Sequence, residues 1–171
     1  MNLTALTTPA QIVQQGILDS LACAPLLPRT AGRIIDIGSG SGFPAVPLAL
    51  VRPEIEFTLV EPSRKKVTFL RHVIRTLKLR FVQVRPSRVE ALLGEAAMSE
   101  SFDIALARAV APLPEIGRMV LPFLRPGGMF LAQTGPAEHV QNAINDLAEC
   151  GFEVTEVRPI VDMGQGWEKS V

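Results

Sequence analysis

Three glycines at alternate positions follow a short apolar run. They are Gly38, Gly40 and Gly42, in the stretch Asp36–Pro44, which reads DIGSGSGFP. Glycine lets the backbone turn sharply and lets a ligand approach without a Cβ atom in the way. The spacing is shorter than the G-x-G-x-x-G fingerprint of dinucleotide folds, which aims a helix N-terminus at a pyrophosphate. The loop, including Ser39, therefore favours a ligand that lies along the backbone without a phosphate, and S-adenosylmethionine is such a ligand.

Glu61 is the second candidate for a cofactor contact. It stands 23 residues after Gly38, at the expected end of a second strand. A carboxylate at this place can accept two hydrogen bonds from a ribose diol. The alternative is a structural turn with a surface glutamate beside it. The glycines, Pro44, Pro47 and a placed acid together favour the cofactor interpretation.

Two later stretches add weaker signals. In Ser87–Glu90, Val89 can pack on an adenine ring and Glu90 can accept a hydrogen bond, or Ser87 simply caps a short helix. Arg108 is the charged residue of the stretch Arg108–Pro114. Its fork can hold the cofactor carboxylate, a phosphate or the O6 edge of guanine, and the alternative is a surface salt bridge. We expect Arg108 to act in catalysis by positioning.

The stretch after Arg108 lacks the residues that other methyl transfers need. It has no Asp/Asn-Pro-Pro-aromatic box to hold an exocyclic amine and no cysteine to attack a pyrimidine; Cys23 and Cys150 lie elsewhere and read as small apolar residues. A covalent adduct is therefore disfavoured, and no general base is evident. A substrate that is already nucleophilic needs neither. Guanine N7, whose lone pair is free even in a base pair, could be methylated by positioning alone.

Short apolar runs alternate with helix-period segments, which predicts an α/β fold. The expected strands are Arg33–Ile37, Glu56–Val60, Arg80–Val84, Phe102–Ala107, Gly128–Gln133 and Phe152–Arg158, and two expected helices are Ser63–Lys78 and Ala137–Cys150. Such repeats form a doubly wound, mostly parallel sheet with helices on both faces. We expect one domain, in which a helical segment over residues 9–27 packs on a Rossmann-like core over 33–158. Ligands then bind beyond the carboxyl ends of the strands.

Composition and charge narrow the class of protein. The 171 residues are 47% hydrophobic and 20% charged, with two cysteines and a net charge of zero. No membrane-spanning segment, secretory signal or metal-ligand spacing is visible, so we expect a cytoplasmic protein without a metal. We also expect a monomer. Residues 52–88 carry a net charge of +7 and residues 136–171 carry −5. The basic part either faces RNA or is an ordinary solvated helix face. The cations predicted to contact RNA are Arg64, Lys65, Lys66, Arg71, Arg75 and Lys78.

The combination of these stretches resembles the ribosomal RNA small subunit methyltransferase G family, also called glucose-inhibited division protein B. The resemblance covers residues 2 to about 135 and rests on DIGSGSGFPAVP (Asp36–Pro47), FTLVEPSRKKVTFL, SRVE, RAVAPLP and RPGG. It implies a class I methyltransferase that uses S-adenosylmethionine to methylate N7 of one guanine in 16S ribosomal RNA, alone or in a small-subunit precursor. It places cofactor contacts at Gly38, Phe43, Val89, Glu90 and Arg108.

The chain also departs from the family pattern. A family histidine is Gly16 here, a family lysine after the fifth strand is Gln133, and both ends are short relative to the family. Two rival functions therefore stay open. One is a methyltransferase for a small molecule, and the other is a relative that binds the cofactor without turnover.

Overall fold

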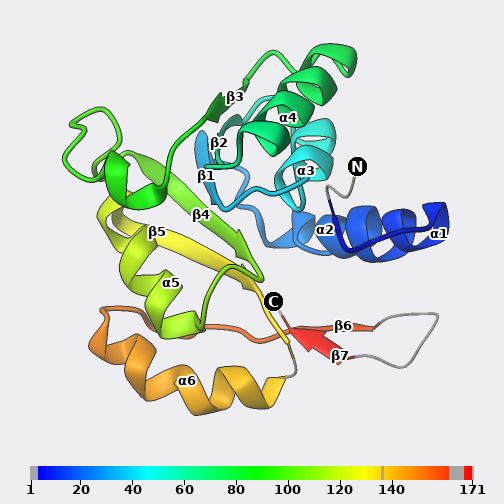
Figure 1. Cartoon of the computed structure of the whole chain (residues 1–171). Helices are drawn as coiled ribbons and strands as arrows, with labels where there is room; N and C mark the ends of the chain where they lie inside the picture. Colours follow the sequence, from blue (N-terminus) through cyan, green and yellow to red (C-terminus); the bar gives the residue numbers. More distant parts are fainter. Residues whose placement is uncertain (1–3, 136, 162–167, 171) are drawn as a thin grey trace.

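A parallel sheet of five strands forms the centre of the protein in the computed structural model, which describes residues 4–135, 137–161 and 168–170 (Figure 1). The strand order is β3-β2-β1-β4-β5. The strands are Arg33–Ile37 (β1), Glu56–Val60 (β2), Val82–Arg85 (β3), Phe102–Arg108 (β4) and Leu124–Gln133 (β5). The order reverses between β1 and β4, and this switch point is where α/β sheets bind ligands. The predicted doubly wound fold is confirmed.

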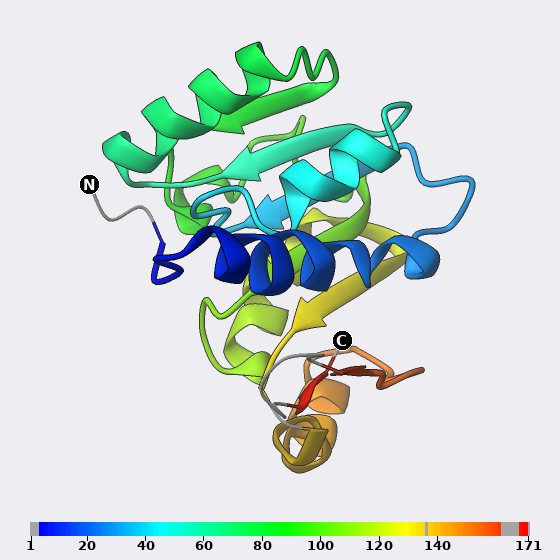
Figure 2. The ribbon, with the colours of Figure 1, turned by 90° about the vertical axis from the view of Figure 1, so that its right-hand side faces the viewer.

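Helices cover both faces of this sheet. The N-terminal helical segment consists of α1 (Pro9–Gln11), the π-helix η1 (Ile12–Leu18) and α2 (Asp19–Leu21), followed by η2 (Ala24–Leu26). This segment lies across one face (Figure 2). The remaining helical elements are α3 (Ala45–Val51), α4 (Arg64–Thr76), η3 (Val89–Leu92), α5 (Leu113–Val120), η4 (Leu121–Phe123) and α6 (Ala137–Glu149).

The core divides by the two-residue period of the strands. On β1, Ile34 packs with Cys23, Leu48 and Leu70 from the N-terminal segment, α3 and α4. The next residue, Ile35, packs in a second cluster with residues of η3 and α5. Successive side chains of a strand point to opposite faces, so a near-continuous apolar run serves two layers of helices at once.

The helix predictions hold to within two residues. The predicted helix Ser63–Lys78 is α4, for which Ser63 is the N-cap, and Lys78 takes a left-handed φ of 54° just beyond its end. The predicted helix Ala137–Cys150 is α6, and Gly151 follows it with a φ of 90°. Glycine adopts this conformation without the penalty that a Cβ atom brings.

The predicted strand Phe152–Arg158 is wrong. Residues 152–158 form no strand, and the short strands β6 (Pro159–Val161) and β7 (Glu168–Ser170) have no pairing partner but each other among the described residues. A groove of about 970 Å³, lined by β5 and by Phe152–Val157, separates this segment from the sheet. The alternating pattern of residues 152–158 is typical of a strand, but a strand also needs a neighbouring strand to pair with. Here a groove lies where that neighbour would have to be.

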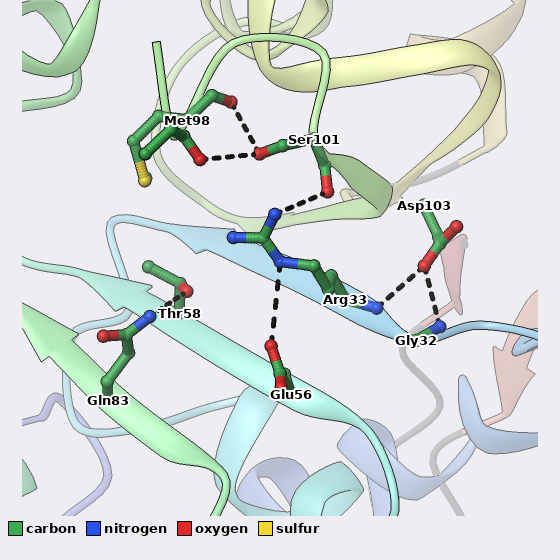
Figure 3. A network of polar contacts seen from close by, with 9 residues as sticks. Gly32, Arg33, Glu56, Thr58, Gln83, Met98, Ser101 and Asp103 are labelled. Atoms are coloured by element: carbon green, nitrogen blue, oxygen red, sulfur yellow. Dashed lines mark hydrogen bonds and ion pairs between the residues drawn. The ribbon is translucent and has the colours of Figure 1, made fainter. Parts of the chain in front are cut away.

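The amino ends of the strands are joined by a polar network (Figure 3). One Asp103 oxygen on β4 accepts hydrogen bonds from the backbone amides of Gly32 and Arg33, both at 2.7 Å. The other accepts one from Arg125 Nε at 2.6 Å. Burial alone would raise the pKa of Asp103, but these hydrogen bonds and the Arg125 charge lower it. Asp103 thus ties β1, β4 and β5 together on the edge opposite the predicted site.

Candidate functional site

The glycine loop connects β1 to α3 at the carboxyl edge of the sheet. All three glycines have positive φ: 69° at Gly38, 58° at Gly40 and 97° at Gly42. The loop is anchored because the amides of Gly38 and Ser39 donate to the carbonyl of Val60, at 2.9 and 3.1 Å. A Cβ atom at Gly40 would meet nothing closer than 3.7 Å, whereas at Gly38 or Gly42 it would meet a side chain at 2.7 to 2.8 Å. The loop therefore leaves its room for a ligand at Gly40.

Ser39 and Glu61 hold this loop in shape. Ser39 is buried, and its Oγ donates to the Asp36 carbonyl at 2.9 Å. Glu61 is 4% exposed; its Oε2 accepts from the Gly40 amide at 2.9 Å and its Oε1 from the Ser63 amide at 2.8 Å. Each carboxylate oxygen can accept more than one hydrogen bond, so Glu61 keeps acceptor capacity at the end of β2.

Asp36, the second-last residue of β1, was not singled out as a site residue from the sequence. It is 1% exposed, and its Oδ2 has no hydrogen-bond partner among the described residues. Burial raises the pKa of Asp36 to about 8, opposed by a hydrogen bond from Ser39 and helped by the charge of Glu61. The signal in the sequence is a lone acid within the apolar strand Arg33–Ile37.

Two apolar side chains lie against the loop. The Phe43 ring packs on the N-terminal segment, where a Cβ atom at Gly16 would be 2.7 Å from Phe43 Cζ. Val110, in the loop after β4, packs on Gly38 and is 41% exposed. The absence of a side chain at Gly16 thus leaves room for the Phe43 ring.

The stretch after β3 does not have the Ser87 cap that was the alternative interpretation of its sequence. Ser87 does not cap η3: its Oγ donates to the Arg88 carbonyl instead, and Arg88 is the N-cap residue. Val89 is buried among Ile37, Val60 and their neighbours, whereas Glu90 is exposed. Val89 therefore supports the sheet from inside, and Glu90 is the residue of this pair that a ligand can reach.

Arg108 and Gln133 end β4 and β5 as register partners. Arg108 Nη2 donates to the Gln15 carbonyl at 2.6 Å, and the same nitrogen is 3.8 Å from Asp19 Oδ2. Gln133 Nε2 donates to the Asp19 carbonyl at 2.7 Å. Sequence reasoning treated Arg108 as a functional or surface residue and Gln133 only as a departure from a pattern. Both in fact join the strand ends to the N-terminal helical segment.

Buried polar atoms without a partner gather at this one edge. Among the side chains that the structure describes they are Asp36 Oδ2, Arg108 Nη1 and Gln133 Oε1. These atoms belong to the last two residues of three adjacent strands. A buried polar atom without a partner is costly, so three at one edge indicate a place built for a ligand.

The predicted RNA-binding cations all lie on or directly beside α4. Arg64, Lys65, Arg71, Arg75 and Lys78 are exposed and Lys66 is half-buried. In the described parts of the chain, none of the six forms an ion pair with an acid. Arg75 instead lies 3.4 Å from the ring of His72. The helix therefore presents uncompensated positive charge.

Other kinds of site are not found within the described ranges. No helix there is long and apolar enough to cross a membrane. No group of three metal-ligating side chains occurs there either. Cys23 lies near Arg108, but burial raises the pKa of its thiol to about 12. A thiol with this pKa does not act as a nucleophile at neutral pH.

Solved structures that superpose on this chain include several named as methyltransferases. The glycopeptide N-methyltransferase MtfA, solved with S-adenosylmethionine, superposes with a TM-score of 0.72 at 14% identity, covering 91% of this chain and 93% of that one. Fibrillarin from Aeropyrum pernix, also solved with S-adenosylmethionine, gives a TM-score of 0.66 at 22% identity, covering 88% and 72%. These likenesses show the class I methyltransferase fold.

Sequence comparison gives the family. Residues 1–167 match the family described as rRNA small subunit methyltransferase G. The curated protein of that name from Roseiflexus castenholzii is 42% identical over 94% of this chain and 69% of its own length. The one from Deinococcus deserti is 41% identical over 91% and 65%. The chain thus spans about two thirds of the length of these relatives. On this match, and on the fold that carries the site, the chain belongs to the rRNA small subunit methyltransferase G family.

Proposed function

We propose that this chain transfers the methyl group of S-adenosylmethionine to N7 of a guanine in the 16S RNA of the small ribosomal subunit. The observation that carries the proposal is the match of residues 1–167 to the family. The carboxyl edge of the sheet supports it, because a glycine cradle, two carboxylates and an arginine meet there. A protein with this substrate acts in the cytoplasm, and we propose that it does so as a monomer with one methyltransferase domain.

The ends of β1 and β2 suit this cofactor, which supplies an electrophilic methyl group on a sulfonium. A Cβ atom at Gly40 would meet nothing closer than the Gly38 carbonyl oxygen at 3.7 Å. Asp36 offers an unpartnered acceptor to a cationic ligand, and Glu61 has acceptor capacity left for hydroxyl groups. The residues that we assign to cofactor binding are Gly38, Ser39, Gly40, Gly42, Phe43, Glu61, Val89, Glu90 and Arg108. Ser39 and Val89 support the cofactor site from the protein interior, because both are buried.

The chemistry asks little of the protein beyond placement. Guanine N7 carries an in-plane lone pair, so no proton has to be removed before it attacks. The role that remains is to hold this lone pair in line with the methyl group, which restricts motion before the reaction. Arg108 lies at the end of β4, next to the switch point, and this position supports such a role. The cations along α4 then hold the RNA backbone without reading its sequence.

Two measurements on the native protein test the function. Calorimetric titration with S-adenosylhomocysteine should show one binding site. Incubation with S-adenosylmethionine and small-subunit RNA should then produce N7-methylguanine, which chemical cleavage of the RNA maps to one position. Cofactor binding with methyl transfer to a small molecule but to no RNA would favour a small-molecule enzyme. Binding without any transfer would favour a non-catalytic relative.

Arg108→Ala tests the positioning residue. Loss of an interaction made in the transition state should lower kcat by about 100-fold or more. The affinity for S-adenosylhomocysteine should fall by a smaller factor, because Arg108 is also assigned to cofactor binding. Arg125→Ala is the matched control, because this arginine also pairs with an aspartate but lies at the opposite edge. Equal activity of both variants would refute the role of Arg108.

A further inference from the structure

One turn of the N-terminal helical segment contacts two strand ends of the site at once. The Gln15 carbonyl accepts a hydrogen bond from Arg108 Nη2, at the end of β4, at 2.6 Å. The Asp19 carbonyl accepts one from Gln133 Nε2, at the end of β5, at 2.7 Å. This segment lies across one face of the sheet (Figure 2), so its backbone reaches the carboxyl edge where the cofactor residues gather.

The π-helix η1 makes the first of these contacts possible. A π-helix bonds five residues back along the chain, whereas an α-helix bonds four residues back. The Asp19 amide accordingly donates to the carbonyls of Gln14 and Gly16. In an α-helix the same amide would donate to the Gln15 carbonyl. Here the Gln15 carbonyl accepts from Arg108 instead, and the widened turn brings the Asp19 side chain to the same place.

The Asp19 carboxylate is the negative charge that faces Arg108 among the described ion pairs. Asp19 is 7% exposed, and its Oδ2 lies 3.8 Å from Arg108 Nη2. Burial lowers the pKa of Arg108, and the charge of Asp19 opposes this shift. Cys23 is also near, but burial raises the pKa of its thiol to about 12, so the thiol is neutral at neutral pH. Asp19 therefore balances the charge of a largely buried guanidinium.

Contacts at one nitrogen fix the direction of the other. The guanidinium is a rigid planar fork, and the Gln15 carbonyl and Asp19 Oδ2 both lie at Nη2 of Arg108. The direction of Nη1 follows from these two contacts. Nη1 is buried and has no partner among the described residues. A buried donor without a partner is costly, so Nη1 is the atom that a bound ligand would satisfy.

The order of the strands indicates which part of the cofactor Nη1 meets. Glu61 and Glu90, which we assign to the adenosine half, follow β2 and β3. These strands lie on one side of β1, whereas β4 lies on the other side. A cofactor that crosses the glycine loop from the adenosine side brings its amino-acid end to β4. The carboxylate of that end is a strong acceptor for a guanidinium.

We propose that Asp19 is a positioning residue for the cofactor: its carboxylate holds Arg108 so that Nη1 points to the carboxylate of S-adenosylmethionine. The inference rests on the proposed function and brings the N-terminal helical segment into the site. Asp19 acts through Arg108 and needs no contact with the cofactor itself.

A purely structural role for Asp19 does not require its charge. The hydrogen bonds of Arg108 to Gln15 and of Gln133 to the Asp19 backbone already tie the segment to the sheet. A buried ion pair, moreover, commonly adds little to stability compared with apolar residues of similar size. The charge of Asp19 is thus better explained by the orientation of Arg108 than by the stability of the fold.

The test compares two ligands that differ at the amino-acid end. S-adenosylhomocysteine carries that end, and methylthioadenosine has a methyl group in its place. Asp19→Asn removes the charge but keeps the side-chain shape and the backbone carbonyl that binds Gln133. Calorimetry should show that the affinity for S-adenosylhomocysteine falls by about 10-fold, within the usual range for coupled neighbours, while the affinity for methylthioadenosine stays the same. A damaged fold would lower both affinities alike, so their ratio isolates the positioning effect.

A double variant and a matched control complete the test. In an Arg108→Ala background, Asp19→Asn should cause no further change in the ratio, because the residue through which Asp19 acts is gone. Asp103→Asn is the control, because Asp103 also pairs with an arginine, Arg125, but at the amino edge, and it should keep the native ratio. Asp19→Ser repeats the comparison with a smaller side chain, so the test does not depend on the folding of one variant.

Several results would overturn the inference. Equal losses for the two ligands would make Asp19 a purely structural residue. An unchanged affinity for S-adenosylhomocysteine would show that Arg108 needs no charged partner. A further change of the ratio in the Arg108→Ala background would show that Asp19 acts independently of Arg108. These results leave methyl transfer by the native protein intact, whereas native protein that binds neither ligand would refute the proposed function and this inference with it.

Discussion

The two edges of the same sheet treat their polar groups in opposite ways. At the amino edge, both oxygens of Asp103 accept hydrogen bonds. The Arg33 amide donates to one of these oxygens, and Arg33 Nη1 donates to the Ser101 carbonyl at 3.2 Å (Figure 3). At the carboxyl edge, Asp36, Arg108 and Gln133 each keep a buried atom without a partner among the described residues. The strands are the same, so the difference lies in what each edge is for.

Satisfied polar groups stabilise a fold, and unsatisfied ones store a cost that a ligand can remove. Asp103 joins three strands where no ligand is expected, so its hydrogen bonds contribute to stability alone. The carboxyl edge gives up part of that stability to keep donors and acceptors free. Substitutions at the two edges should therefore separate into effects on stability and effects on binding.

The largest effect is expected at Gly40. Gly40→Val places a branched side chain on the glycine loop at a φ of 58°, where a Cβ atom would meet nothing closer than the Gly38 carbonyl oxygen at 3.7 Å. Affinity for S-adenosylhomocysteine should fall at least about 100-fold, which corresponds to about 3 kcal/mol. Calorimetry checks this. Gly127→Val is the control, since Gly127 also has a positive φ, of 74°, and a Cβ atom there would meet nothing within 4 Å. Equal affinities in the two variants would remove the cofactor from this loop.

Asp103→Ala should show the reverse behaviour. Two backbone amides and Arg125 lose their acceptor, so the free energy of unfolding should fall by about 2 kcal/mol, as urea denaturation measures. The folded variant should bind S-adenosylhomocysteine as the native protein does. Asp103→Asn keeps an acceptor oxygen and should lose less. A clear drop in affinity for either variant would show that the edges are not independent.

The raised pKa of Asp36, at the carboxyl edge, predicts how the free energy of unfolding depends on pH. Its pKa is raised to about 8 in the folded protein from an ordinary 3.8, mainly by burial. The folded state thus holds a proton that the unfolded state releases. This contribution to stability is complete below pH 3.8 and is lost as the pH rises through 8. The free energy of unfolding should fall by up to about 1.4 kcal/mol per pH unit within that window.

Asp36→Asn removes this titration. Urea denaturation between pH 5 and 8, at about one-unit steps, should show a flatter profile for the variant than for the native protein. Glu56→Gln, at an exposed carboxylate on the amino edge, should leave the native slope unchanged. If Asp36→Asn kept that slope, the Asp36 carboxylate would have to be ionised and partnered in the folded state.

The sequence indicated the layout of this site better than its contacts. The positive-φ glycines could be predicted, because a strand, a tight turn and a helix start are each marked by local residues. The absence of the expected strand Phe152–Arg158 could not be predicted. A strand needs a pairing partner, and which segment lies beside it depends on the tertiary structure. The hydrogen bond of Gln133 could not be predicted for the same reason. This bond depends on which strand lies next to β5 and on a carbonyl of Asp19, 114 residues away, whereas local patterns record only near neighbours.

The smallest effect is expected on the surface of α4, outside both edges. Replacing Arg71, Arg75 and Lys78 by glutamine removes three exposed charges, while the apolar face with Val67 and Leu70 keeps the helix packed. Each lost phosphate contact should reduce the slope of log affinity against log salt by about 0.7 to 0.9. RNA titrations at several salt concentrations measure this slope. The matched triple variant replaces the exposed Arg29, Arg118 and Arg125 and should keep the native slope. A flattened slope in the matched variant, or an unchanged slope in the α4 variant, would mean that the RNA lies on another surface and that α4 is an ordinary solvated helix.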